Sequence, residues 1–157
     1  MERRISRVVL GIFLGLSLIL GSWILLGRAV LAAPVNLAKQ PVIEVTVQLG
    51  DQAGHLKFDP PALSFDAGQR YQLHLINDSP TKHYFTAKDF ADGVWSQKVD
   101  TGGVEVKGAI HEIEVRSHAY ADWVFVPVRA GRYDLRCTVA GHTEAGMVGD
   151  LEIVGQV

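Results

Sequence analysis

Apolar and polar residues alternate in several short stretches of the chain from about residue 41 onward. Residues 42–49 place an apolar side chain at every second position, which is the period of a half-buried strand. The same period recurs in residues 71–75, 133–137 and 151–153, while residues 121–126 form a more continuous apolar run. The pattern therefore predicts at least five strands and indicates an all-β protein.

Turn signals separate these stretches at close intervals. Clusters of glycine, asparagine, aspartate and proline occupy residues 50–54, 66–68, 77–80 and 130–131. Residues 58–65 are apolar, but Pro60 and Pro61 interrupt them, which favours an edge segment over a central strand. Residues 110–115 indicate a strand without a clean apolar face, and residues 87–91 a short helix capped by Thr86. Many short strands with little helix predict a β-sandwich.

The amino-terminal region has a different character. Arg3, Arg4 and Arg7 precede an uncharged apolar run over residues 8–26, which is typical of an export signal. The run is close to the roughly 20 residues that span a bilayer, and residues 30–32 form an acceptable cleavage site. This pattern fits removal of the segment as a signal peptide and equally its retention as a single-pass membrane anchor. The arginines would keep the amino end of such an anchor in the cytoplasm.

These features predict three parts: residues 1–32 as a signal peptide or membrane anchor, residues 33–40 as a tether, and residues 41–157 as one domain. The domain is expected in the periplasm or at the extracytoplasmic face of a membrane, with possible attachment through residues 8–26. Without residues 1–32 the chain has 11 basic and 16 acidic residues, a formal charge of −5. No basic stripe tracks a phosphate backbone, which argues against nucleic acid as a partner.

The chemistry of the chain concentrates in residues 135–147. Cys137, His142 and Met147 offer a thiolate, an imidazole and a thioether among small residues and glycines. Soft sulfur and borderline nitrogen donors so spaced suit copper better than a hard cation. Cys137 is the only cysteine, so an internal disulfide is impossible, and a free thiol outside the cytoplasm is a liability unless something occupies it. The alternative is a structural cysteine beside a surface histidine and a core methionine.

A fourth donor has to come from an earlier part of the chain. His74 lies in mid-strand on the same face as polar Gln72, which favours a solvated side chain. His83 follows the turn that begins at Asn77 and lies at one end of the predicted sandwich. The residues alone leave both histidines as candidates, with His83 better placed.

At this point the sequence resembles a known family. Residues 77–85, the approach over residues 127–137, and the Cys137-x4-His142-x4-Met147 pattern are similar to the cupredoxins, the small blue copper proteins that include plastocyanin, azurin and auracyanin. The resemblance covers nearly all of residues 41–154. It implies a Greek-key β-sandwich with one mononuclear type 1 copper ion. His83, Cys137 and His142 would form the trigonal plane and Met147 the weak axial contact.

Three positions near the ligands depart from the family pattern, and a fourth fits it. Tyr84 replaces the small polar residue that usually ties the two ligand loops together, Ala140 stands where a proline often stiffens the loop, and Lys82 replaces a glycine. Thr138 fits the pattern, and we expect its backbone amide to donate to the thiolate. Tyr84 and Ala140 mark where this version is expected to differ from the family.

The resemblance implies a single-electron carrier and no enzyme. Redox partner proteins are expected to dock briefly near His142, through an apolar patch formed by its small neighbours. The alternative is an extracytoplasmic protein that stores or delivers copper without redox cycling. A copper oxidase or nitrite reductase needs further histidine-bound copper centres, and His55, His74, His111 and His118 are scattered among polar segments. Zinc is disfavoured because a thioether is a poor ligand for it.

Overall fold

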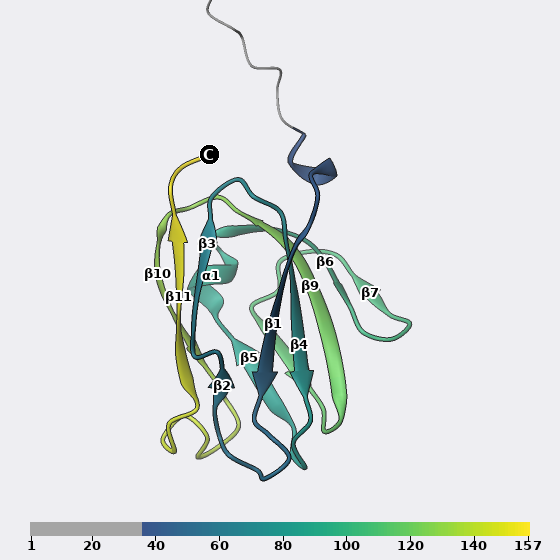
Figure 1. Cartoon of the computed structure of the whole chain (residues 1–157), viewed down its shortest axis with the longest axis vertical. Coiled ribbons are helices and arrows are strands. Elements are labelled where there is room, and N and C mark those ends of the chain that lie inside the picture. Colours follow the sequence, from purple (N-terminus) through teal and green to yellow (C-terminus); the bar gives the residue numbers. More distant parts are fainter. Residues whose placement is uncertain (1–35) are drawn as a thin grey trace, which may run out of the picture. The chain divides into compact units, whose positions relative to one another are not determined.

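The computed structural model describes residues 36–157, which fold into two packed β-sheets (Figure 1). The first sheet has the spatial order β2 (Phe58–Asp59), β1 (Ile43–Leu49), β4 (Tyr71–Asn77), β9 (Ala119–Pro127), β6 (Val94–Asp100) and β7 (Glu105–Val106). The second has the order β3 (Ala62–Asp66), β11 (Val148–Val154), β10 (Gly131–Arg136), β5 (His83–Thr86) and β8 (Glu112–Val115). The predicted all-β sandwich is confirmed.

Two parallel pairs show how the chain passes between the sheets. β1 pairs in parallel with β4, and β3 pairs in parallel with β11, while the remaining ladders are antiparallel. Parallel neighbours cannot be joined by a tight hairpin. The chain between β1 and β4 therefore runs through β2 in the first sheet and β3 in the second, and so links the two layers along one side.

The prolines fall where the chain changes sheets. Residues 58–65 were predicted as an edge segment, and they split into β2 and β3, each at the edge of a different sheet. Pro60 and Pro61 lie between the two strands. A proline has no N–H to give to a sheet ladder, so it is tolerated at this crossing, where ladder pairing stops.

Aromatic side chains fill much of the space between the sheets. Phe65, Phe90, Trp123 and Phe125 are at most 2% exposed and meet mainly edge to face, at centroid separations of 4.8–5.9 Å. Phe90 comes from the short helix α1 (Lys88–Ala91), so this one turn contributes to the core. Most of the alternating apolar positions are buried in this layer, whereas Ile43 at the start of β1 is exposed.

The predicted short helix is present, but its expected cap is wrong. The residue at the N-cap is Ala87, with no side-chain hydrogen bond, and the Thr86 hydroxyl instead donates to Glu112 over 2.7 Å. Thr86 still belongs to β5, where it pairs with Arg136 of β10. Its side chain is therefore used for contact between strands.

Within the described residues 36–40 of the predicted tether lies one 3-10 turn, η1 (Leu37–Lys39), and the Gln40 side chain donates to the carbonyl oxygen of Gly68 over 3.0 Å. The signal or anchor predicted for residues 1–32, including the apolar run 8–26, lies outside the described residues. Within residues 36–157, no helix has the length and apolar character to cross a bilayer.

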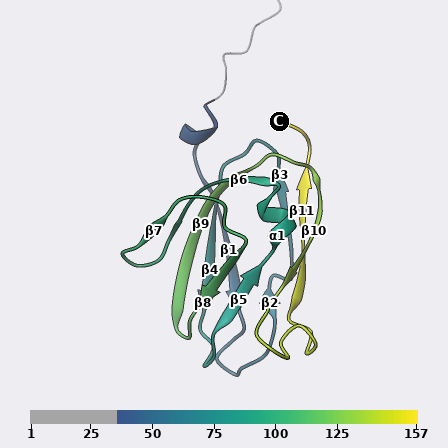
Figure 2. The ribbon, with the colours of Figure 1, turned by 180° about the vertical axis from the view of Figure 1, so that it is seen from behind.

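Three connections that are distant in sequence lie at one end of the sandwich: the turn after β1, the turn between β4 and β5, and the loop between β10 and β11. β1 and β4 run downward in Figure 1, β5 starts at the lower end, and the loop between β10 and β11 closes there (Figure 1). Figure 2, the reverse view, shows β5 and β8 side by side with the same end downward. This end of the fold positions the candidate site.

Candidate metal centre

His83 is placed by a hydrogen-bonded turn between β4 and β5. The side chain of Asn77 donates to the carbonyl oxygens of Thr81 and Val115, over 2.8 and 2.9 Å, and accepts from the backbone N–H of Ser79 over 3.0 Å. Asn77 is fully buried, and these three bonds satisfy its amide. The turn therefore delivers His83 to the first position of β5, where it is 1% exposed.

Cys137 is placed by the tight loop that follows β10. It is fully buried, and its backbone N–H donates to the carbonyl oxygen of Met147 over 3.1 Å. The Thr143 hydroxyl donates to the Cys137 carbonyl oxygen over 2.6 Å. The Met147 N–H donates to the carbonyl oxygen of His142 over 2.9 Å. These bonds fold residues 137–147 back on themselves, as the small residues and glycines of the segment permit.

The structure brings three predicted donors together. His83 Nδ1 lies 3.2 Å from His142 Nδ1 and 3.9 Å from Cys137 Sγ, and His142 Nδ1 lies 3.3 Å from the sulfur. One ligand atom from each residue falls within 4.8 Å of the others. Metal bonds of about 2.0–2.3 Å to nitrogen and sulfur separate donor atoms by roughly 3–4 Å. The spacing therefore fits a single metal ion bound by all three side chains.

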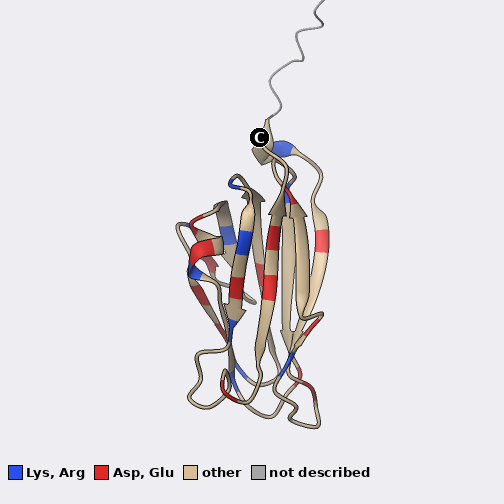
Figure 3. Cartoon of the chain, turned by 90° about the vertical axis from the view of Figure 1, so that its left-hand side faces the viewer, with Lys and Arg blue, Asp and Glu red and all other residues tan. Residues whose placement is uncertain are grey.

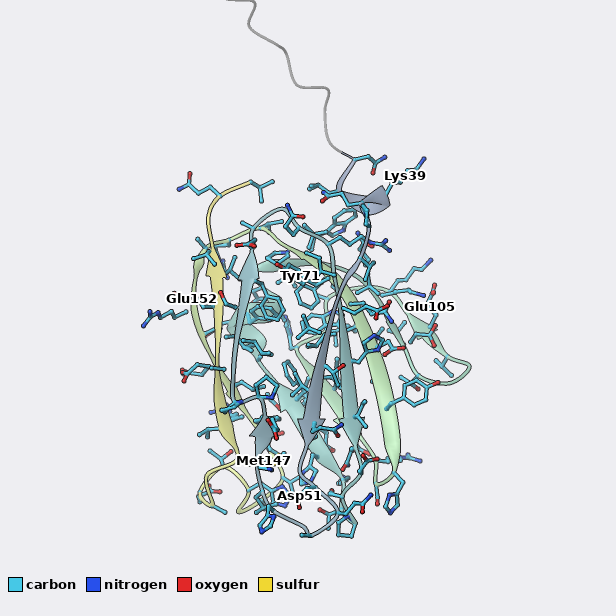
Figure 4. The ribbon with its side chains drawn as sticks, viewed as in Figure 1. Lys39, Asp51, Tyr71, Glu105, Met147 and Glu152 are labelled. Atoms are coloured by element: carbon cyan, nitrogen blue, oxygen red, sulfur yellow. The ribbon has the colours of Figure 1, made fainter. Side chains whose placement is uncertain are left out.

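Met147, the fourth predicted donor, closes the same loop. Its side chain is fully buried in the core, and its backbone bonds to both Cys137 and His142. Figure 4 labels it at the lower end of the sandwich, as it does Asp51 of the turn after β1. Its part as a weak axial ligand remains a prediction that this placement permits.

A backbone amide links the two ligand segments. The Tyr84 nitrogen lies 3.3 Å from Cys137 Sγ and donates to it. The sequence indicated Thr138 as the amide donor, whereas the donor that the structure shows is Tyr84. The Thr138 hydroxyl instead donates to Glu112 over 2.6 Å and lies 3.1 Å from the Thr86 hydroxyl. The Thr138 side chain therefore ties the start of the ligand loop to β5 and β8.

Burial lowers the pKa of His83 below its ordinary value of 6.5, and the neighbouring His142 lowers it further. A buried imidazole with no carboxylate beside it gains little from protonation. Neutral imidazole is also the form that binds a metal. The environment of His83 therefore favours the state that coordination requires.

His142 lies at the boundary between the site and solvent. It is half-buried, and Ala140, Gly141, Ala145 and Gly146 around it are exposed. Glu144 is the only charged residue between Cys137 and Met147. Figure 3 shows charged residues along the strands and also in some of the loops at the lower end. The candidate site therefore meets solvent through a small loop surface with one charged residue, Glu144.

The other described histidines lie outside this group. His74 Nδ1 is 2.6 Å from Asp122, His55 Nδ1 is 2.7 Å from Asp51, and the ring of His111 contacts Asp92 over 2.8 Å. His118 is exposed. Between the two candidates for the fourth donor, the structure groups His83 with the loop residues and pairs His74 with a carboxylate on another strand.

Two residues at the site were missed by sequence reasoning. Ser79 is fully buried with its hydroxyl 2.8 Å from His83 Nε2. A Cβ on Gly50 would lie 2.7 Å from the same nitrogen. Both belong to segments that the sequence marked only as turns. A serine four residues before His83 and a glycine at the end of a strand were the available signals, and neither is specific.

No protein-family model matches the sequence, and no curated protein is significantly similar to it. Similar solved structures exist at low identity. A copper nitrite reductase from Nitrosomonas europaea is 12% identical, with a TM-score of 0.57, and the match covers 76% of this chain and 52% of that one. A multicopper oxidase from Pediococcus acidilactici is 17% identical, with a TM-score of 0.54, and the match covers 78% and 28%.

A smaller protein also matches. Auracyanin A, a "blue" copper protein from Chloroflexus aurantiacus, is 18% identical with a TM-score of 0.47, and the match covers 73% of this chain and 100% of that one. The matches to the nitrite reductase and the oxidase span about half or less of the length of those two enzymes. The resemblance seen in the sequence is confirmed at the level of architecture: residues 36–157 have the cupredoxin fold.

Proposed function

We propose that the domain binds one copper ion through His83, Cys137 and His142, with Met147 as a weak axial ligand, and carries single electrons. The observation behind this proposal is the meeting of one thiolate and two imidazole nitrogens within 4.8 Å at a buried point. One sulfur and two nitrogen donors, with a thioether in the same loop, suit copper better than zinc or a hard cation.

The site is held in a form that suits electron transfer. The N–H, the carbonyl oxygen and the sulfur of Cys137 are hydrogen-bonded to Met147, Thr143 and Tyr84, respectively. His83 is enclosed by the core and by the turn at Ser79. Copper in such a site supplies a one-electron couple. The chain keeps the donors nearly fixed in both oxidation states, so that little has to rearrange when the electron moves.

We further propose that redox partners dock over the loop around His142. The half-buried imidazole and its exposed small neighbours connect the donor cluster with solvent. Such contacts between carriers are small and brief. The basic lead and the apolar run at the amino terminus support a working place outside the cytoplasm, with or without a membrane anchor.

Copper storage or delivery without redox cycling is the second candidate. The same donors would serve it, and the exposed edge of His142 would give a copper-exchanging partner access. The nitrite reductase and oxidase that share the fold raise an enzymatic role as well. Within residues 36–157 the grouped donors comprise a single set, His83, Cys137 and His142, which supports a carrier with one metal.

The test uses the full-length protein loaded with Cu(II). A carrier should show an intense thiolate-to-copper band, lose it on one-electron reduction, and regain it on oxidation with its copper retained. Cys137→Ala and His83→Ala should remove the band, whereas His55→Ala, at a side chain 71% exposed and paired with Asp51, should keep it. Absence of the band in the wild type contradicts the proposal. Release of copper during the cycle supports storage or delivery.

A further inference from the structure

The hydroxyl of Ser79 lies at the centre of a buried hydrogen-bond cluster behind His83. Its oxygen is 2.8 Å from His83 Nε2, 2.7 Å from Asn77 Oδ1 and 2.8 Å from the carbonyl oxygen of Thr81. Ser79 and Asn77 are fully buried and His83 nearly so. Solvent therefore does not compete for these groups, and their protons have to be shared among the protein atoms present.

The few protons in this cluster restrict the directions of its hydrogen bonds. A serine hydroxyl has one proton to donate. The Thr81 carbonyl oxygen can only accept. Asn77 Oδ1 also accepts, because the other end of the amide, Nδ2, faces the carbonyl oxygens of Thr81 and Val115 and must be the donor. Two acceptors thus compete for the single Ser79 proton, and this arrangement favours a proton on His83 Nε2 that is donated to the Ser79 oxygen.

We propose that Ser79 is a positioning residue that holds His83 in the tautomer with its proton on Nε2. The lone pair then lies on Nδ1, the atom that faces Cys137 Sγ at 3.9 Å and His142 Nδ1 at 3.2 Å. A neutral imidazole binds a metal only through the unprotonated nitrogen. Ser79 therefore presents the lone pair of His83 to the donor cluster before any metal arrives.

The backbone at Gly50 closes the other side of the pair. A Cβ there would lie 2.7 Å from His83 Nε2 and 3.1 Å from Ser79 Cβ. The Gly50 N–H donates to the Lys57 carbonyl oxygen over 2.8 Å, which anchors the segment. The imidazole is thus confined between a backbone segment and the Ser79 hydroxyl. A ring flip about the Cβ–Cγ bond would put Cε1 in the place of Nε2, so the bond to Ser79 would be lost.

The tautomer is a property of the metal-free protein, while the consequence for copper rests on the proposed function. The first measurement is therefore made on the metal-free, full-length, ¹⁵N-labelled protein, by long-range ¹H–¹⁵N correlation of the imidazole nitrogens. We expect His83 to be a single tautomer, protonated at Nε2. A proton on Nδ1, or an even mixture, overturns the proposal without reference to any variant.

Ser79→Ala is the second measurement, and Ser117→Ala is its matched control. The Ser117 hydroxyl donates to the Ser79 carbonyl oxygen over 2.6 Å, so it supports the same turn through another atom. We expect Ser79→Ala to give a mixture of His83 tautomers and to lower copper affinity roughly 10–100-fold, as loss of a histidine's outer partner does. Ser117→Ala should keep the Nε2–H tautomer and an affinity within about twofold of the wild type.

The two proposals fail in different ways. If the wild type does not bind copper, the proposed function is contradicted, and the tautomer in the metal-free protein still decides the role of Ser79. If the wild type binds copper and Ser79→Ala retains both its tautomer and its affinity, the role of Ser79 is contradicted while the copper site stands. Equal effects of Ser79→Ala and Ser117→Ala on the tautomer also contradict it, because they would assign the effect to the turn alone.

Discussion

The backbone nitrogen of Tyr84 lies 3.3 Å from the sulfur of Cys137 and donates a hydrogen bond to it. The bond joins the start of β5 to the loop after β10. Because Tyr84 directly follows the proposed ligand His83, the bond links the segment of that ligand to a second proposed ligand, Cys137. Because the donor belongs to the main chain, it does not depend on the side chain at position 84. A tyrosine can therefore replace a small polar residue there without removing this tie between the ligand segments.

Tyr84→Phe should leave the copper site unchanged. The variant loses the phenol contacts to Glu114 and Lys82 at the surface but keeps the amide bond to the sulfur. We expect a loss of less than about 1 kcal/mol in the free energy of unfolding, because exposed contacts contribute little. The visible spectrum and potential of the copper-loaded protein provide the measurement. Tyr120→Phe, at an exposed side chain of β9, is the control. A shifted band in Tyr84→Phe alone would assign the tie to the side chain.

Gly50→Ala should disrupt the site, and Gly54→Ala should not. Both glycines have a positive φ, 71° and 82°, so both variants bear the strain of about 1–2 kcal/mol for a side chain in that region. Only at Gly50 does the new methyl group meet His83 and Ser79, whereas at Gly54 the nearest atom is 4.0 Å away. We expect an additional loss of about 1–3 kcal/mol in unfolding free energy from overpacking.

Urea unfolding and copper titration of the two variants measure the difference. Equal stability and equal copper binding would show that the Gly50 backbone does not confine His83.

Met147→Leu should keep copper bound and raise the reduction potential. The swap preserves the volume of a fully buried side chain and should cost less than about 1.5 kcal/mol in unfolding free energy. Loss of the thioether removes a donor that stabilises Cu(II) more than Cu(I), and axial ligands tune the potential of such sites. Redox titration gives the result. Leu151→Met, a buried swap on β11, should leave the potential unchanged. An unchanged potential in Met147→Leu would exclude the axial role.

The metal-free protein should lose stability as the pH falls below about 6.5. The pKa of His83 is lowered in the folded state, so the unfolded chain takes up its proton first. Stability is therefore fully present above the unfolded value of 6.5 and is lost as the pH falls from there toward the folded value. Urea unfolding between about pH 7.5 and 5.5 tests this. His83→Asn, which cannot be protonated there, should show a smaller slope. Equal slopes would contradict the prediction.

A charge placed beside His142 should slow electron exchange. Ala145→Asp adds an anion to the exposed loop, whereas Val154→Asp adds the same charge at the far end of β11 (Figure 1). Rim charges act mainly on association rates. We expect the electron self-exchange rate of the copper-loaded Ala145→Asp variant to fall on the order of tenfold at low salt, and the Val154→Asp rate to change little. Similar rates in the two variants would place the docking surface elsewhere.

Much of the fold is encoded in local pattern. The strands at residues 43–49, 71–77 and 148–154 follow from the alternation of apolar and polar residues, and Pro60 and Pro61 mark a break between edge strands. Which strands pair, and that β1 and β4 are parallel, depends on contacts between residues far apart in the chain. A period of two gives the face of each residue but not its neighbour across the sheet.

The sequence alone determined the donor types, the spacing of Cys137, His142 and Met147, and the presence of a histidine after a turn. Only the tertiary structure decided that His83 and not His74 meets them, that the amide of Tyr84 and not Thr138 reaches the sulfur, and that Ser79 and Gly50 enclose the imidazole. The reason is physical. Ligand identity is a property of side chains, but distances between donors and the direction of a buried proton depend on how separate segments pack.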